Sequence, residues 1–165
     1  MTDKALTQLI GQTELDALSQ KAAASPRLRM NCNLHRSDKE ACHRLLNAIE
    51  PGSYIRPHRH LGAGKEETLL LIRGKMGLVL FTETGGIEQT VLFTPLGDPR
   101  MVHIPLGQYH TWLSLQTGSI FFETKAGPYL PLSAAEMAPW APAEGDASAM
   151  SYLSSLRERF VPGKD

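Results

Sequence analysis

Two histidines in the segment 57–60, Pro-His-Arg-His, have the residue type and spacing that most clearly suggest chemistry. The chain has six histidines, and a single residue separates His58 from His60. On an extended strand side chains alternate between faces, so His58 and His60 share one face while Arg59 points away. Two imidazoles on one strand are half of a metal site, or else two solvated surface groups, and the rest of the sequence must decide between these alternatives.

Two further side chains complete a candidate metal site. Glu67 stands at the start of the next expected strand, and the tight turn in PLGQYH, residues 105–110, delivers His110 onto a later strand. Three neutral imidazoles and one carboxylate suit a divalent transition metal such as zinc, iron, manganese or nickel. We therefore expect His58, His60, Glu67 and His110 to hold one such ion, with coordination positions left open for a ligand.

The elements that must position these residues follow from the hydrophobic pattern. Residues 13–24 predict a short helix that ends at Ser25-Pro26. Residues 27–35 alternate strictly between polar and apolar side chains, which predicts a strand with a buried apolar face. The polar face of this strand is expected to be solvated, with ligand binding as the alternative; it carries Arg27, Arg29, Asn31, Asn33 and His35.

A series of short apolar segments separated by turn residues fills the middle of the chain. They are residues 53–60, 67–74, 76–83, 87–95, 100–107, 110–116 and 119–125. Residues 43–50, just before them, fit either a helix or a strand, and the turn and strand that follow closely favour a strand. Strands that recur about every ten residues, with glycine at the turns, predict an antiparallel sandwich or barrel. Beyond them, residues 133–143 predict a short helix and a proline-rich loop, and residues 150–160 predict an amphipathic helix.

Composition and charge exclude several classes of protein. The length of 165 residues suits a single domain with a sizeable core, and the formal net charge of zero argues against a nucleic-acid partner. No apolar run approaches the about 18 residues of a transmembrane helix, and the N-terminus lacks the features of a signal peptide. With only Cys32 and Cys42, which form no paired motif, we expect reduced thiols, a cytoplasmic location and no membrane partner.

The order and spacing of the candidate ligands resemble the two motifs of the cupin superfamily. The first motif, G-x5-H-x-H followed by E-x6-G, is matched by Gly52, His58, His60, Glu67 and Gly74. The central part of the second motif, P-x-G-x-x-H, is matched by Pro105, Gly107 and His110. The resemblance implies an all-β fold, the cupin double-stranded β-helix or jelly-roll barrel, over about residues 27–130. Short helices at about 13–24 and within about 133–160 would flank this barrel in a single domain of residues 1–165.

The sequence departs from the first motif in one respect that bears on the ligands. Residues 61–66 form a longer turn between His60 and the acidic ligand than is common in cupins. Glu66 is therefore an alternative to Glu67, although the spacing to Gly74 favours Glu67. Ser114 stands where the second motif often ends in Asn, which is not a ligand. The remaining histidines, His35, His43 and His103, are not expected to bind the metal.

Further segments narrow the resemblance to the WbuC family of cupin-fold metalloproteins. They are residues 25–35, 47–60, 123–129 and 138–144, and the similarity spans roughly residues 20–145. Members of that family are typically encoded with bacterial O-antigen or other surface-polysaccharide genes. The resemblance implies a metal-dependent enzyme that acts on a sugar or sugar nucleotide, such as an isomerase, epimerase or lyase.

Two other classes of function stay open at this point. Open positions on iron beside imidazole and carboxylate ligands also suit a metal-dependent oxygenase. A non-catalytic module that binds metal or sugar is the third alternative. Tightly bound zinc without oxygen uptake argues against the oxygenase, and turnover of a nucleotide sugar argues against the non-catalytic module.

The sequence also suggests which residues bind the small-molecule ligand and how chains associate. Arg56, Lys125 and Tyr129 are expected at the mouth of the barrel, where they would bind an anionic or sugar ligand. The alternative is that Lys125 pairs with Glu123 in a purely structural role and that the arginines serve a dimer interface. Because a small barrel exposes strand edges, we also expect a homodimer, with the strand over residues 27–35 as the candidate to pair across the interface.

Overall fold

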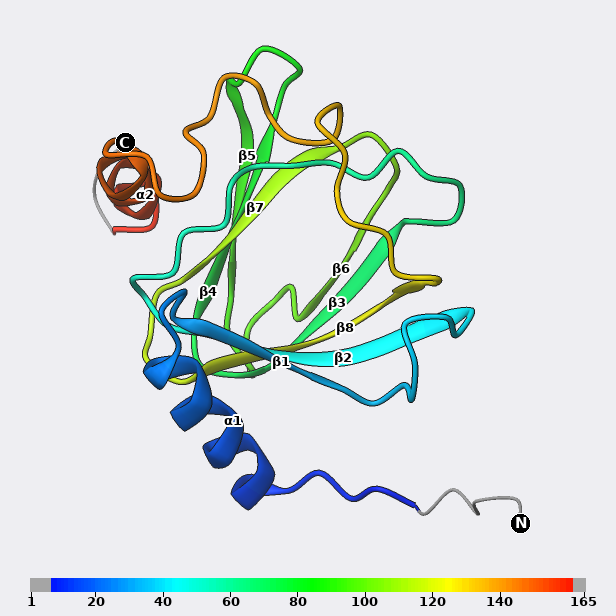
Figure 1. Cartoon of the computed structure of the whole chain (residues 1–165). Coiled ribbons are helices and arrows are strands. Elements are labelled where there is room, and N and C mark those ends of the chain that lie inside the picture. The colour runs from blue at the N-terminus through cyan, green and yellow to red at the C-terminus, as the bar shows by residue number, and fades with distance from the viewer. Residues whose placement is uncertain (1–6, 162–165) are drawn as a thin grey trace.

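The strands of this chain form two antiparallel sheets that together make a barrel, as the computed structural model of residues 7–161 shows (Figure 1). The five-stranded sheet has the order β1 (Arg29–Asn33), β2 (Cys42–Ile49), β8 (Ser119–Ala126), β3 (Glu67–Arg73) and β6 (Met101–Ile104). The three-stranded sheet has the order β5 (Ile87–Phe93), β4 (Met76–Phe81) and β7 (Tyr109–Ser114). This arrangement confirms the predicted all-β fold, the cupin-type jelly-roll barrel with short flanking helices.

The core lies between the two sheets and follows from the alternation of side chains along each strand. In β3, Leu69 and Leu71 are buried while Leu70 is exposed, because successive side chains point to opposite faces. The inward side chains of β3 meet Phe93 and Trp112 from the opposite sheet in one apolar cluster. These apolar side chains form the core between the two sheets.

The two helices cover the outside of the barrel. Helix α1 (Gln12–Ala24) packs Leu18 and Ala22 against Leu46, Ala48 and Ile120 on the outer face of the five-stranded sheet (Figure 1). Helix α2 (Ala149–Glu158) buries Leu153 and Leu156 in a cluster with side chains of β4 and β7. Neither helix, within residues 7–161, has the length and apolar character that crossing a membrane requires.

Two segments differ from the structure that their patterns predict. Residues 53–60 do not form a regular strand: His58 makes only isolated antiparallel bridges, to His110 and to Met137. Pro57 has no N–H to donate to a ladder, which limits pairing there. Residues 133–143 contain turns and no helix, because Pro139 and Pro142 interrupt helical hydrogen bonding. The segment instead binds back to the chain that carries His58, where Ala138 N–H donates to the Pro57 carbonyl at 3.0 Å.

Candidate metal centre

Backbone hydrogen bonds join the segment that carries His58 and His60 to the segment that carries His110. The N–H of His58 donates to the carbonyl of His110 at 3.0 Å, and the N–H of His110 donates to the carbonyl of His58 at 2.9 Å. The turn before His110 is held in the same way, since Gly107 N–H donates to the His60 carbonyl at 2.9 Å. Gly107 has φ +82°, a left-handed conformation that favours glycine at this turn. The two sequence motifs are therefore fixed directly against each other.

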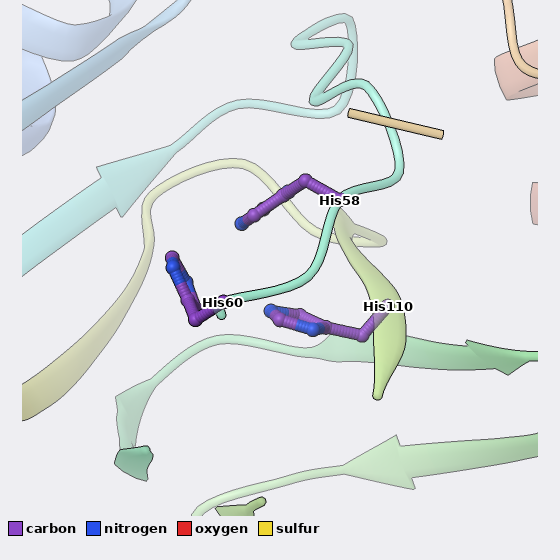
Figure 2. A group of neighbouring side chains, drawn as sticks. All are labelled: His58, His60 and His110. Atoms are coloured by element: carbon purple, nitrogen blue, oxygen red, sulfur yellow. The ribbon is translucent and has the colours of Figure 1, made fainter. Parts of the chain in front are cut away.

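The imidazoles of His58, His60 and His110 converge on one space (Figure 2). Each ring offers one nitrogen to this space, and the three nitrogen atoms all lie within 4.8 Å of one another. His58 and His60 come from the irregular segment after Pro57, and His110 comes from β7. This is the arrangement in which three histidines can bind a single ion.

Backbone carbonyls orient two of the three rings. Nδ1 of His58 lies 3.0 Å from the carbonyl oxygen of Arg56, and Nδ1 of His110 lies 3.0 Å from that of Gln108. A carbonyl oxygen only accepts, so each Nδ1 carries the proton and each Nε2 keeps its lone pair. Metal-binding histidines characteristically donate their second ring nitrogen to such a partner, which fixes both the tautomer and the ring plane.

Two of the candidate donor nitrogens are buried, and the third belongs to a ring that is neutral. Nε2 of His60 and Nε2 of His110 are buried and have no hydrogen-bond partner among the described residues. Burial, together with the neighbouring His110, lowers the pKa of His58 to about 3, so this ring is neutral at neutral pH. Buried unpaired nitrogen lone pairs are costly unless something binds them. The donor set therefore fits a divalent transition metal.

The carboxylate of Glu67 lies against two of the three imidazoles. Oε1 of Glu67 lies 3.0 Å from Nε2 of His60, and Oε2 lies 3.4 Å from Nε2 of His110. Glu67 is buried because it shares the inner face of β3 with Leu69 and Leu71, whereas Glu66 lies before β3 and is only partly buried. Burial alone would raise the pKa of Glu67, but His110, His60 and the Lys125 charge hold this pKa well below its usual range.

A chain of buried and half-buried polar groups extends from Glu67 along the inner face of the five-stranded sheet. Lys125 is the direct cross-strand neighbour of Glu67, and its Nζ lies 2.8 Å from Glu67 Oε1 and 2.7 Å from Glu123 Oε1. Asn47 in turn donates to Oε2 of Glu123 at 2.9 Å. Burial would lower the pKa of Lys125, but the charges of Glu123 and Glu67 outweigh burial and raise it. The ammonium group of Lys125 is therefore charged and shared between two carboxylates.

Two cavities meet at the candidate metal ligands. The outer cavity, of about 530 Å³, is lined by residues that include His58, His60, Lys125, Tyr129 and Glu136. The inner cavity, of about 400 Å³, lies inside the barrel and is lined by residues that include His58, Glu67, His110, Trp112, Glu123 and Lys125. His58 and Lys125 line both cavities, so the candidate metal site is accessible from two sides.

The structure separates the three residues that we expected to bind the ligand. Lys125 and Tyr129 both line the outer cavity, and Tyr129 is 56% exposed. Arg56 lines neither cavity: its Nε and Nη2 donate to the carbonyl of Ala138, at 3.2 Å and 2.7 Å. Arg56 thus anchors the turns after β8 and does not present its charge to a ligand in either of these cavities.

Glu136 also shapes the site, and the sequence reasoning did not identify it. Its Oε1 accepts from Leu61 N–H at 3.1 Å, directly after His60, while its Oε2 accepts from Ser133 N–H and Ser133 Oγ, both at 2.8 Å. The hydrogen bonds from Ser133, with those from Leu61, lower the pKa of Glu136 to about 2. The spacing S-x-x-E could have revealed this pairing, since it is the signature of a capping box, although here it closes a turn.

The barrel has the cupin-type fold, and its three converging imidazoles form a candidate metal site. The chain belongs to the family described as a domain of unknown function (DUF6016), whose model matches residues 10–93. The matched segment contains His58, His60 and Glu67 and ends before His110. Among curated protein sequences, none matches the chain.

Several solved structures are similar to this chain at low sequence identity. A conserved protein of unknown function from Streptococcus pyogenes (SPY1581) is 8% identical, with 78% of this chain and 95% of that chain covered and a TM-score of 0.50. KdgF from Halomonas sp. is 14% identical, with 62% and 82% covered and a TM-score of 0.49. A cupin superfamily protein from Desulfitobacterium hafniense DCB-2 is 12% identical, with 59% and 76% covered and a TM-score of 0.46. At these identities the likeness concerns the fold alone.

Proposed function

We propose that this chain is a metal-dependent enzyme that acts on a sugar or sugar nucleotide, with His58, His60, Glu67 and His110 as the ligands of one divalent transition metal ion. One observation carries the proposal of a metal site: three imidazole nitrogens lie within 4.8 Å of one another. Two of the rings are held in the required tautomer by backbone carbonyls. Glu67 adds a negative charge that offsets the charge of the ion.

The chain's own residues prepare the site for a substrate. When bound, a divalent ion in such a site polarises a carbonyl or hydroxyl oxygen of the substrate. Lys125 holds the carboxylate of Glu67 at 2.8 Å, which restricts the orientation of that side chain. The outer cavity, at about 530 Å³, has the size of a small-molecule site, and Tyr129 stands at its exposed side.

The sugar chemistry rests on the resemblance to the WbuC family and not on the metal ligands. That resemblance extends the proposal to bacterial surface-polysaccharide metabolism, O-antigen biosynthesis included. We also propose a cytoplasmic location, because Cys32 and Cys42 form no paired motif and are expected as reduced thiols. The test is elemental analysis of the purified protein, followed by a turnover screen with nucleotide sugars and small carboxylates. Turnover of a nucleotide sugar that is lost in His58→Ala supports the proposal.

Other outcomes of that screen would favour the other classes of function. Substrate-linked oxygen uptake by the iron-loaded protein would favour a metal-dependent oxygenase. A sugar that binds without any turnover would favour a non-catalytic metal- and sugar-binding module. These outcomes are distinguishable because the first consumes dioxygen and the second leaves the ligand chemically unchanged.

We also propose that the chain forms a homodimer. β1 lies at one edge of the five-stranded sheet and pairs only with β2 within residues 7–161, so the other side of Arg29–Asn33 can pair with a second copy. Pairing of two such edges about a two-fold axis would give a continuous sheet across the interface. Sedimentation that shows only monomer at micromolar concentration would remove this proposal.

A further inference from the structure

The outer cavity has an apolar wall beside the candidate metal ligands. The segment that follows β8, yellow to orange in Figure 1, supplies most of this wall, and the residue directly after His60 supplies the rest. The apolar wall consists of Leu61, Tyr129, Leu130, Pro131 and Leu132. His58, His60 and Lys125 line the same cavity, so polar and apolar side chains surround one space of about 530 Å³.

Three side chains of the apolar wall are exposed to a large extent. Leu61 is 46% exposed, Tyr129 is 56% exposed and Leu130 is 66% exposed. Single exposed apolar residues are common, but apolar side chains that gather on one surface mark a site of interaction. These three gather around one cavity that also contains imidazoles, so an apolar group of a ligand in that cavity would cover them.

Polar contacts hold the apolar wall at the end nearest β8. The N–H of Tyr129 donates to the carbonyl of Asp38 at 2.7 Å. The ammonium group of Lys65 donates to the carbonyl of Ala126 at 2.8 Å and also to that of Pro128. The chain that enters the wall is therefore fixed to the loop before β2 and to the turn before β3.

The carboxylate of Glu136 holds the other end of the apolar wall. One of its oxygens accepts from Leu61 N–H at 3.1 Å, and the other accepts from Ser133 N–H at 2.8 Å. Between the two fixed ends, residues 130–132 form no hydrogen bond with any part of the chain that the structure describes. Their position is set by the flanking contacts, which keep an apolar stretch of chain at the cavity.

The chemistry of the wall favours an alkyl chain over a bare sugar or a nucleobase. Residues 130–132 are two leucines and a proline, whose side chains neither donate nor accept hydrogen bonds. A sugar hydroxyl or the polar edge of a base that is buried against them would lose its water without gaining a partner. An alkyl chain instead removes apolar surface from water on both sides of the contact, which is favourable.

We propose that the substrate of this site carries an alkyl or acyl chain, which lies in the outer cavity against Leu61 and residues 129–132 while the polar end of the molecule points toward the three imidazoles. The inference deepens the proposed function, on which it rests for the polar end of the substrate. A sugar or sugar nucleotide that bears an acyl group is the substrate class that matches both parts of the cavity.

Binding of straight-chain alcohols tests the apolar wall separately, because an uncharged hydroxyl end requires neither a metal nor a sugar site. The probes are butan-1-ol, hexan-1-ol and octan-1-ol, with uridine as the nucleobase probe, and NMR titration of the protein as purified gives each dissociation constant. The test variant carries Leu61→Gln and Leu130→Gln, which replace two exposed apolar side chains with polar ones of similar size. The matched control is Met150→Gln, which alters an exposed apolar residue of a different cavity beside α2.

We expect affinity to rise with the length of the alcohol. Each methylene group that moves from water into a fully apolar site strengthens binding by about fourfold. Because the cavity is open to water on one side, the gain from butan-1-ol to octan-1-ol should be smaller than this maximum but at least about tenfold. In the double variant the gain should fall to about threefold or less, whereas Met150→Gln should keep the gain of wild type. Uridine should bind more weakly than octan-1-ol.

Three results would overturn the inference: affinity that does not rise with chain length, the same rise in the double variant as in wild type, or a rise that Met150→Gln abolishes. Uridine that binds more tightly than octan-1-ol, and loses affinity in the double variant, would assign the wall to a nucleobase and overturn the choice of an alkyl chain. Failure of the proposed function is a separate result. The expected rise without turnover of any nucleotide sugar would uphold the apolar wall and reject the enzyme, whereas turnover without the rise would do the reverse.

Discussion

The Nζ of Lys125 lies 2.8 Å from Oε1 of Glu67. The carboxylate beside the histidines is therefore held by a cation from β8, the strand that pairs with β3. The same Nζ lies 2.7 Å from Oε1 of Glu123, which places one ammonium group between two buried carboxylates. Burial and the charge of Glu67 raise the pKa of Glu123, because two carboxylates are close together. Lys125 therefore stabilises the polar interior of the barrel as well as the orientation of Glu67.

Lys125→Met should destabilise the metal-free protein. Removing the cation leaves Glu67 and Glu123 without the charge that compensates their burial, which costs about 3 kcal/mol in comparable buried pairs. Thermal unfolding should show a Tm lower than that of wild type by several degrees. Added divalent metal should recover part of this loss, since its charge replaces that of Lys125 next to Glu67.

The matched control for this change is Lys39→Met, which alters an exposed lysine in the loop before β2. Its Tm should equal that of wild type. A Lys125→Met protein with the Tm of wild type would show that the two carboxylates do not depend on Lys125.

Glu67→Gln and Glu66→Gln form a pair that tests which carboxylate binds the metal. The first removes the charge beside His60 and His110 and should weaken metal binding by more than about tenfold. Loss of a residue that only hydrogen-bonds to a metal ligand already lowers metal affinity by about tenfold or more. The second alters the residue directly before β3 and should leave the affinity unchanged. Competition with a coloured chelator measures both affinities, and the opposite pattern would assign the ligand role to Glu66.

The position of Glu67 could be predicted from the sequence, because two local signals agree. The alternation of Glu67, Leu69 and Leu71 places the carboxylate on the buried face of β3. The turn at Gly74 fixes the end of that strand, since φ there is +87° and an added Cβ would lie 2.4 Å from Ser119 Oγ. Hydrophobic periodicity and turn residues are local properties of the sequence. Most of the strands and both helices could be predicted from them for the same reason.

The orientation of Arg56 could not be predicted in this way. Alternation along a strand places Arg56 beside His58, but residues 53–60 form only isolated bridges and the rule does not hold there. Its actual partner is the carbonyl of Ala138, which is distant in sequence. The pairing of Lys125 with Glu67 is likewise set by which strands become neighbours, and that depends on the whole topology.

The salt bridges between Glu144 and two arginines predict a pH dependence of stability. Arg27 Nη2 lies 2.9 Å from Glu144 Oε2, and Arg29 Nη2 donates to Oε1. Burial would raise the pKa of Glu144, but the hydrogen bonds from Arg27 and the charge of Arg29 outweigh burial and lower it. The pKa of Glu144 is lower in the folded state than in the unfolded state, where it is about 4.3. The stabilisation is therefore fully present above that pH and is lost as the pH falls through the pKa of the folded state.

Glu144→Gln should therefore lower the Tm at pH 7 by about 2 °C, since a pair that is partly exposed to water contributes no more than about 1 kcal/mol. The difference from wild type should shrink progressively below about pH 4, where wild-type Glu144 becomes protonated. Glu88→Gln, at an exposed position of β5, is the control and should match wild type throughout. A Glu144→Gln deficit that persists unchanged at pH 2 would contradict the electrostatic origin of the effect.

The metal content of single histidine variants tests the central claim most directly. Each protein is loaded with a divalent transition metal, dialysed against a weak chelator and analysed for bound metal by mass spectrometry, with circular dichroism to verify folding. Wild type and His103→Ala, whose ring is exposed and bonded to Thr68, should retain one ion per chain. His58→Ala and His110→Ala should retain almost none, because each loses a ring nitrogen of the converging set. If folded His58→Ala and His110→Ala proteins keep the full wild-type metal content, the metal centre described by these residues does not exist.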